Sequence, residues 1–197
     1  MKKSDSLPSS AALQAAHLIE RLGRVLRAGD HATGLNPVQA EALRYLGRAN
    51  RFSRTPAALA DFLGSTRGTV SQTLLALEAK RLIRRQANAR DGRSVTLALT
   101  KAGTEYLKSD PVRTLAASID ASGADARLAE YLGATLREAI VQRGGRTFGA
   151  CNTCRHLRRD QSRGAAPHYC ALLQEPLSDI DVSSICAEQQ DGPQVRP

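Results

Sequence analysis

Four cysteines lie close together in the last quarter of this chain of 197 residues. They are Cys151, Cys154, Cys170 and Cys186, with the spacing C-x2-C-x15-C-x15-C, and no cysteine precedes them. A C-x2-C turn lets two thiolates bind one metal centre, and two more distant cysteines can complete a four-thiolate site. The spacing therefore predicts a metal or cluster site in this part of the chain.

The identity of the metal centre follows less directly from the spacing. Structural zinc sites often use two C-x2-C turns, whereas the second half here supplies single cysteines. One close pair with two isolated thiolates is compatible with an iron–sulfur cluster, whose ligands can be widely scattered. We therefore expect an iron–sulfur cluster, with zinc as the alternative. His156 and His168 lie near the cysteines, and either could replace one of them.

A second group of polar residues lies on one face of an expected helix. In the run LADFLGSTRGTVSQTLLALEAK, a short helix ends at Gly64 and a second helix follows, which is the outline of a helix-turn-helix. Val70, Leu74 and Leu77 repeat at helical spacing and should face the core. The opposite face carries short donors and acceptors with one cation and neither Glu nor Lys, which suits the major groove of DNA. The expected DNA-binding residues there are Ser65, Thr66, Arg67, Thr69, Ser71, Gln72 and Thr73.

A β-hairpin should follow this helix. Leu82 and Ile83 begin one short strand, residues 94–99 alternate as a second, and Asp91-Gly92 between them is a strong turn signal. The hairpin would carry Arg90 and Arg93 at its tip, where arginines can enter a narrow minor groove. Both are therefore expected DNA contacts.

The distribution of charge agrees with a DNA partner. The formal net charge is +9, yet residues 151–197 carry five arginines and six acidic residues, so the basic excess lies in the first 150 residues. Such an excess suggests a polyanion, and an aromatic content of 4% without Trp argues against stacking on single strands as the main binding mode. We therefore expect double-stranded DNA as the partner.

Other classes of protein are less compatible with the sequence. No apolar run is long enough to span a membrane, and no apolar stretch follows the two lysines near the start, so we expect a cytoplasmic protein without a secretory signal. Thiols in the cytoplasm are normally reduced, which disfavours disulfides. There is no phosphate-binding loop, HExxH motif or Ser/His/Asp order, so we do not expect an enzyme.

Several helices must position these residues. Apolar periodicity predicts a helix over residues 10–28, broken by Gly29, Asp30, Thr33 and Gly34. Asn36-Pro37, Thr55-Pro56 and Asp110-Pro111 each combine a capping residue with a proline suited to the first helical position. A further helix is expected from Ala102 to Ser109, and the last should end near Gln142. Apolar stripes between 111 and 142, together with the first helix, favour a dimer interface.

The run from Leu59 to Gly103 resembles the winged helix-turn-helix of MarR-type bacterial transcriptional regulators. The family's Asp-x-Arg-Ser wing tip and following Leu-Thr-x-x-Gly are matched by Asp91–Ser94 and by Leu99, Thr100 and Gly103. The resemblance extends over roughly residues 10–143 and implies a homodimer on a palindromic operator. One departure is Arg81, where the family usually has Gly; in a left-handed conformation Arg would cost on the order of 1 kcal/mol.

These observations predict a mainly α-helical fold with a small β-wing. The expected organisation is a flexible N-terminus (1–9), a winged helix-turn-helix with dimerisation helices (10–143, DNA-binding core 35–103), and a cysteine-rich tail (144–197). The predicted function is a dimeric transcriptional regulator whose tail senses redox state or iron and acts by biasing the spacing of the two recognition helices. The alternative is the same regulator with a structural zinc and a small-molecule inducer pocket.

Overall fold

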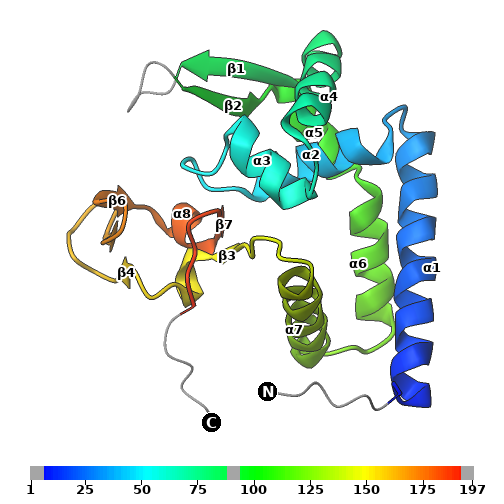
Figure 1. Ribbon diagram of the computed structural model, residues 1–197. Helices are drawn as coiled ribbons and strands as arrows, with labels where there is room; N and C mark the ends of the chain where they lie inside the picture. Colours follow the sequence, from blue (N-terminus) through cyan, green and yellow to red (C-terminus); the bar gives the residue numbers. More distant parts are fainter. Residues whose placement is uncertain (1–6, 88–93, 192–197) are drawn as a thin grey trace.

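Helices form most of the structure, and short strands are confined to a wing and to the C-terminal part of the chain (Figure 1). The computed structural model describes residues 7–87 and 94–191. The helices are α1 (Ser10–Ala32), α2 (Pro37–Arg48), α3 (Pro56–Leu63), α4 (Arg67–Ala79), α5 (Lys101–Lys108), α6 (Pro111–Ala121), α7 (Ala126–Gln142) and α8 (Asp179–Ser183), with a 3-10 turn η1 (Cys151–Thr153). The strands are β1 (Ile83–Ala87), β2 (Val95–Leu99), β3 (Gly149–Ala150), β4 (Leu157–Arg158), β5 (His168–Cys170), β6 (Glu175–Leu177) and β7 (Ile185–Cys186). The predicted mainly helical fold with a β-wing is confirmed.

Side-chain caps begin the helices where the sequence predicts them. The Asn36 side chain accepts a hydrogen bond from the Gln39 amide at 2.8 Å, and the Gln39 side chain completes a capping box at the start of α2. Thr55 caps α3 and Asp110 caps α6, each followed by a proline in the first turn. Gly64 ends α3 in the left-handed conformation.

The first helix is longer than the sequence predicts. It continues past Gly29 and Asp30 to Ala32, so the prediction that these two residues break it is wrong. A Cβ atom on Gly29 would lie 2.9 Å from Cβ of Pro111, so the missing side chain lets α1 approach α6. Asp30 is buried and forms an ion pair with Arg44 on α2. Packing and charge pairing therefore outweigh the weak helix propensity of these two residues.

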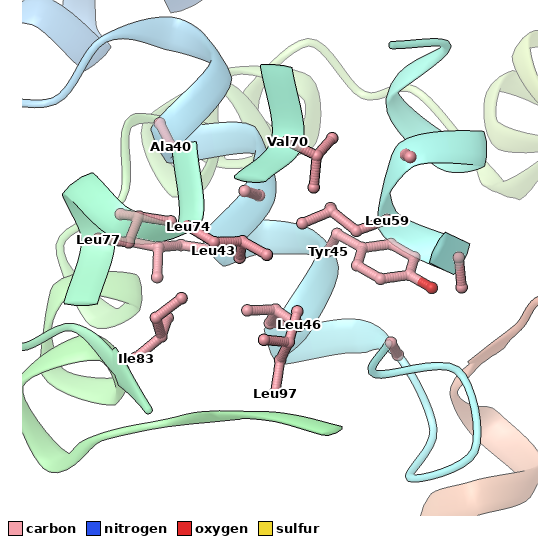
Figure 2. Close-up of a cluster of buried hydrophobic side chains, with 14 of the residues drawn as sticks. Ala40, Leu43, Tyr45, Leu46, Leu59, Val70, Leu74, Leu77, Ile83 and Leu97 are labelled. Atoms are coloured by element: carbon pink, nitrogen blue, oxygen red, sulfur yellow. The ribbon is translucent and has the colours of Figure 1, made fainter. Parts of the chain in front are cut away.

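The main hydrophobic core lies between α2, α3, α4 and the wing. Figure 2 shows Leu43 of α2 beside Leu74 of α4 and Leu46 of α2 beside Leu97 of β2, with Leu59 of α3 and Leu77 of α4 in the same cluster. The predicted inward stripe of α4 is confirmed, because Val70, Leu74 and Leu77 are all buried. The core thus fixes the face of α4 that remains in contact with solvent.

The wing is an antiparallel pair in which Ile83 lies opposite Leu99 and Ala87 opposite Val95. Gly103, the last residue of the Leu-Thr-x-x-Gly run, has its backbone against the wing entry: a Cβ atom there would lie 2.1 Å from the Leu82 carbonyl oxygen. Arg81 has φ +58°, so the left-handed conformation anticipated for this site is present.

The helices α1, α6 and α7 form the opposite end of the molecule from the wing (Figure 1). No residue of α6 or α7 is buried, and several large apolar side chains on α1 and α7 are exposed. The predicted apolar stripes are therefore only partly covered by the described part of this chain: Leu115 and Ile119 of α6 are half-buried, whereas Tyr131 and Leu136 of α7 are exposed. None of its helices is both long enough and apolar enough to cross a bilayer.

The cysteine-bearing segment packs against the α2–α3 region. Phe148 forms edge-on ring contacts with Phe62 of α3 and Tyr45 of α2, at centroid distances of 5.3 and 6.2 Å. Ala187 is buried in the main core, and Ile185 packs on it. The tail thus leaves α7 and returns to the helix-turn-helix of its own chain, a connection that the sequence does not predict.

Candidate functional site

The exposed face of α4 carries most of the predicted DNA-binding residues. Thr66 caps the helix by accepting a hydrogen bond from the Thr69 amide at 3.2 Å, and the two hydroxyl oxygens lie 2.9 Å apart. Thr66, Arg67, Thr69, Ser71 and Gln72 are exposed, and Ser65 is half-buried at the turn before the helix. The structure therefore brings six of the seven predicted residues to one surface at the start of α4.

Thr73 does not belong to this surface. Its side chain is buried, and its hydroxyl donates a hydrogen bond to the Thr69 carbonyl at 3.0 Å. The expectation that Thr73 shares the exposed face of α4 with the other six residues does not hold, because its side chain lies on the core side of the helix. Leu75, two residues further along α4, is 50% exposed. Sequence reasoning missed Leu75, although an apolar group in a major groove can contact a thymine methyl.

Arginines on the wing lie next to the exposed face of α4. Arg84 and Arg85 follow Ile83 on β1 and are exposed. Arg85 pairs with Glu78 at 3.0 Å and lines a groove of about 90 Å³ together with Arg67 and Ser71. Two guanidinium groups and a hydroxyl around a groove beside a helix N-terminus can hold a phosphate group. The predicted contacts Arg90 and Arg93 lie outside the described residues.

The topology of the tail brings the four cysteines to one place. Pairing of β3 with β7 sets Gly149 opposite Cys186, so Cys186 lies beside Cys151 at the start of η1. Pairing of β4 with β5 sets Leu157 opposite Cys170, which brings Cys170 towards the turn that contains Cys154. The four cysteines line one small cavity of about 10 Å³, whose other walls are mainly apolar. No disulfide joins them.

Two thiols in this cavity, those of Cys151 and Cys186, have pKa values shifted in opposite directions. The hydrogen bond between Cys151 and Cys186 lowers the pKa of Cys186 to about 6, against the opposing effect of burial. The same bond and burial raise the pKa of Cys151. Nitrogen donors also surround the sulfurs: the Leu173 amide lies 3.4 Å from Cys170 Sγ, and Asn50 Nδ2 lies 3.5 Å from Cys151 Sγ. Donors of this kind stabilise thiolates.

The four cysteines are not arranged with metal-site geometry in this structure. Within residues 7–87 and 94–191, no set of three or more His, Cys, Asp or Glu side chains is placed to hold a metal ion. His168 is committed elsewhere, because Nδ1 accepts from the Asp160 amide at 3.3 Å and Nε2 lies 2.9 Å from Asp179 Oδ1. His156 lines the cavity, with Nε2 3.0 Å from Gln190 Oε1.

A larger cavity of about 320 Å³ lies between α1, α2 and α3. Its lining mixes charged and aromatic groups, including Arg27, Glu41, Arg44, Tyr45 and Phe62. Burial raises the pKa of Glu41, and the charge of Arg44 only partly opposes this shift. Its volume lies within the range of small-molecule sites, roughly 300–1,000 Å³.

The helix-turn-helix, the wing and the polar face of α4 together have a counterpart among known families. The MarR family model matches residues 33–94. MarR-like architecture extends further than this segment. The crystal structure of Staphylococcus aureus MepR in its DNA-binding conformation is 21% identical and covers 68% of this chain and 98% of MepR, with a TM-score of 0.56. The MepR–DNA complex is 20% identical and covers 68% of this chain and 99% of MepR, with a TM-score of 0.51.

These structural similarities show that the fold is the MarR-like winged helix-turn-helix. No match was found among curated proteins.

Proposed function

We propose that this protein is a MarR-type transcriptional regulator that binds double-stranded DNA through α4 and the wing. The observation that carries this proposal is the exposed polar surface at the start of α4, from Thr66 to Gln72, on a fold shared with the MepR–DNA complex. Groups near the helix start, including Arg67, are suited to phosphates, and Gln72 can reach a base edge. The groove between Arg67 and Arg85 supports a phosphate contact at the wing side.

A second copy of the chain is the proposed partner of α1 and α7. Val25 is 70% exposed, Tyr131 71% and Leu136 62%, although all three are large and apolar or aromatic. Apolar patches of this kind mark interaction sites in soluble proteins. A homodimer would cover both helices and present two copies of α4 to the two halves of a palindromic operator.

The four cysteines are proposed to hold an iron–sulfur cluster through which the regulator senses redox state or iron. Cys151, Cys154, Cys170 and Cys186 line one mainly apolar cavity, with N–H donors at the sulfurs of Cys151 and Cys170, which suits thiolate ligands. The cluster would supply a centre whose charge changes with oxidation or iron loss, and the protein would supply the four thiolates and the dry surroundings.

A zinc ion is the second candidate for this site, and one observation favours it. The cavity of about 10 Å³ is small, which suits a single ion better than a larger cluster. In that case the 320 Å³ cavity beside Arg44 would be the regulatory site and would hold a small-molecule inducer.

Operator binding by the full-length protein tests the DNA-binding proposal. Gln72→Ala should reduce the preference for operator over random duplex by about 1–3 kcal/mol in a salt-controlled titration. Thr73→Ser keeps a hydroxyl at a buried position and is the matched control, with the preference unchanged. Arg90→Ala and Arg93→Ala should each flatten the salt dependence by about one unit if they contact phosphates. Unchanged preference in Gln72→Ala would contradict the assignment of α4.

Anaerobic purification without added metal tests the cysteine site. An iron–sulfur cluster gives coloured protein with iron and sulfide bound, whereas zinc gives colourless protein. Operator affinity measured before and after oxidation or metal removal then decides whether the site senses redox state or iron. Equal affinity with the fold intact would refute the sensing role even if iron is present.

A further inference from the structure

The loop between α2 and α3, residues 49–55, is in direct contact with the cysteine-bearing segment. Ala49 forms a parallel bridge with Ile185, and the Asn50 amide donates a hydrogen bond to the Ile185 carbonyl at 2.8 Å. The Ala187 amide donates to Ser53 Oγ at 2.9 Å. These two tail residues flank Cys186, so the loop holds the chain on both sides of one cysteine.

The side chain of Asn50 connects the loop to a second cysteine. Its oxygen accepts hydrogen bonds from the amides of Phe52 at 3.2 Å and Ser53 at 3.0 Å, which shapes the loop. Its nitrogen lies 3.5 Å from Cys151 Sγ, and the residue is only 2% exposed. A single buried amide thus links the backbone of the loop to a sulfur in the cavity.

The other side of the loop is attached to the DNA-binding elements. Tyr45 of α2 donates its hydroxyl hydrogen bond to the Ser53 carbonyl at 2.7 Å. The Leu97 amide of β2 donates to the Arg54 carbonyl at 2.7 Å, and Thr55 caps α3. A displacement of the loop would therefore reach both α3 and the wing.

We propose that this loop transmits the state of the cysteine site to the helix-turn-helix of the same chain, with Asn50 and Ser53 as positioning residues. The inference rests on the proposed metal site. A metal fixes the positions of Cys151 and Cys186 and leaves negative charge on their sulfurs, which strengthens an N–H donor aimed at them. Metal binding then holds Asn50, Ser53 and the start of α3 in one arrangement. This route lies within one subunit.

The coupling has a reciprocal consequence. If the loaded site changes operator affinity by some factor, operator DNA must change metal affinity by the same factor. Removing a positioning residue should reduce this shared factor, because the coupling passes through the loop. A residue that acts only on the stability of the tail would not have this effect.

The test uses full-length wild type, Asn50→Asp and Ser53→Ala, with Ser183→Ala as the control. Asn50→Asp keeps the oxygen that shapes the loop and removes the donor to Cys151. Ser183 is a tail serine whose hydroxyl bonds stay within α8. Each protein is compared in the metal-depleted state and after loading with Fe(II) and sulfide or, separately, with Zn²⁺. Circular dichroism and urea midpoints confirm that each variant is folded.

Hydrogen exchange gives the direct readout. Loading should slow exchange of the Phe52 and Ser53 amides by about tenfold or more in wild type and Ser183→Ala, and much less in Asn50→Asp and Ser53→Ala. The ratio of operator affinities between loaded and depleted protein should fall to within about threefold of one in the two loop variants. Chelator competition should show the same loss of coupling between DNA and metal.

The outcomes separate this inference from the proposed function. Equal protection of the loop in wild type and in both loop variants, or no protection in wild type, would overturn the inference. If wild type shows loop protection but identical operator affinity in both states, the sensing function fails and the contact between site and loop stands. A chain that retains neither iron nor zinc would overturn both this inference and the proposed metal site.

Discussion

Arg44 on α2 donates from Nε to both carboxylate oxygens of Asp110, at 3.0 and 2.8 Å, and Asp110 caps α6. The other end of the same guanidinium pairs with the buried Asp30 on α1. One arginine therefore joins the winged helix-turn-helix to the two helices at the opposite end of the molecule. Both carboxylates are almost completely buried, so they depend on this cation for their charge balance.

Replacing Arg44 should destabilise the protein strongly. Arg44→Ala leaves two buried carboxylates without their partner, which costs about 3–5 kcal/mol for a buried pair. Urea unfolding measures the loss. Arg24→Ala is the control, because Arg24 pairs with Glu20 on the surface and such pairs contribute about 0–1 kcal/mol. Equal unfolding free energies for the two variants would contradict a structural role for the buried cluster.

Two glycines on α1 should respond in opposite ways to replacement by alanine. At Gly29 the new methyl group would lie against the rigid ring of Pro111, and overpacking of this kind costs typically about 1–3 kcal/mol. At Gly23 it would meet only the flexible end of Arg27, so the better helix propensity of alanine should add up to about 1 kcal/mol. Thermal unfolding distinguishes the two. A stabilised Gly29→Ala would show that α1 and α6 are not in close contact.

The left-handed conformation of Arg81 predicts a stabilising substitution. Glycine adopts a positive φ without the steric cost of a Cβ atom, so Arg81→Gly should increase the free energy of unfolding by about 1 kcal/mol. Arg81→Ala removes the same charge but keeps the Cβ atom, so it should give no comparable gain. If both variants behave alike, the effect comes from the side chain rather than from the backbone.

The aromatic contact at Phe148 should hold the cysteine-bearing segment in place. Phe148→Ala removes the edge-on contacts with Phe62 and Tyr45, and the loss for this half-buried ring is about 1–3 kcal/mol. Limited proteolysis should then cleave residues 144–191 faster than in wild type. Ile180→Ala is the control, because this side chain is 75% exposed and its truncation should change stability by less than about 0.5 kcal/mol. An unchanged cleavage rate in Phe148→Ala would show that the ring does not anchor the segment.

Local signals in the sequence predicted much of the fold. The starts of α2, α3 and α6 follow from a capping side chain and an adjacent proline, and both act within one turn of helix. The inward face of α4 follows from the spacing of Val70, Leu74 and Leu77. The burial of Thr73 could not be predicted, because it depends on which elements cover that side of the helix.

Contacts between distant segments account for what the sequence did not reveal. The continuation of α1 through Gly29 and Asp30 involves Pro111, about 80 residues later in the chain, and Arg44 of α2. The four cysteines could be grouped from their spacing, but Asn50 and Ser53 carry no motif that would assign them to the cysteine site. Their role is visible only once the tail is seen against the α2–α3 loop.

The distance along the chain between Asn50 and Cys151, 101 residues, has a consequence for synthesis on the ribosome. Chains elongate at about 5–20 residues per second, so the α2–α3 loop emerges roughly 5–20 seconds before its partner. During that interval the faces of Tyr45 and Phe62 that contact Phe148 are not yet covered by it, and the Asn50 amide lacks its Ile185 partner. A chaperone that recognises exposed aromatic surface would bind during that interval, and a pause in translation before residue 148 would lengthen the interval.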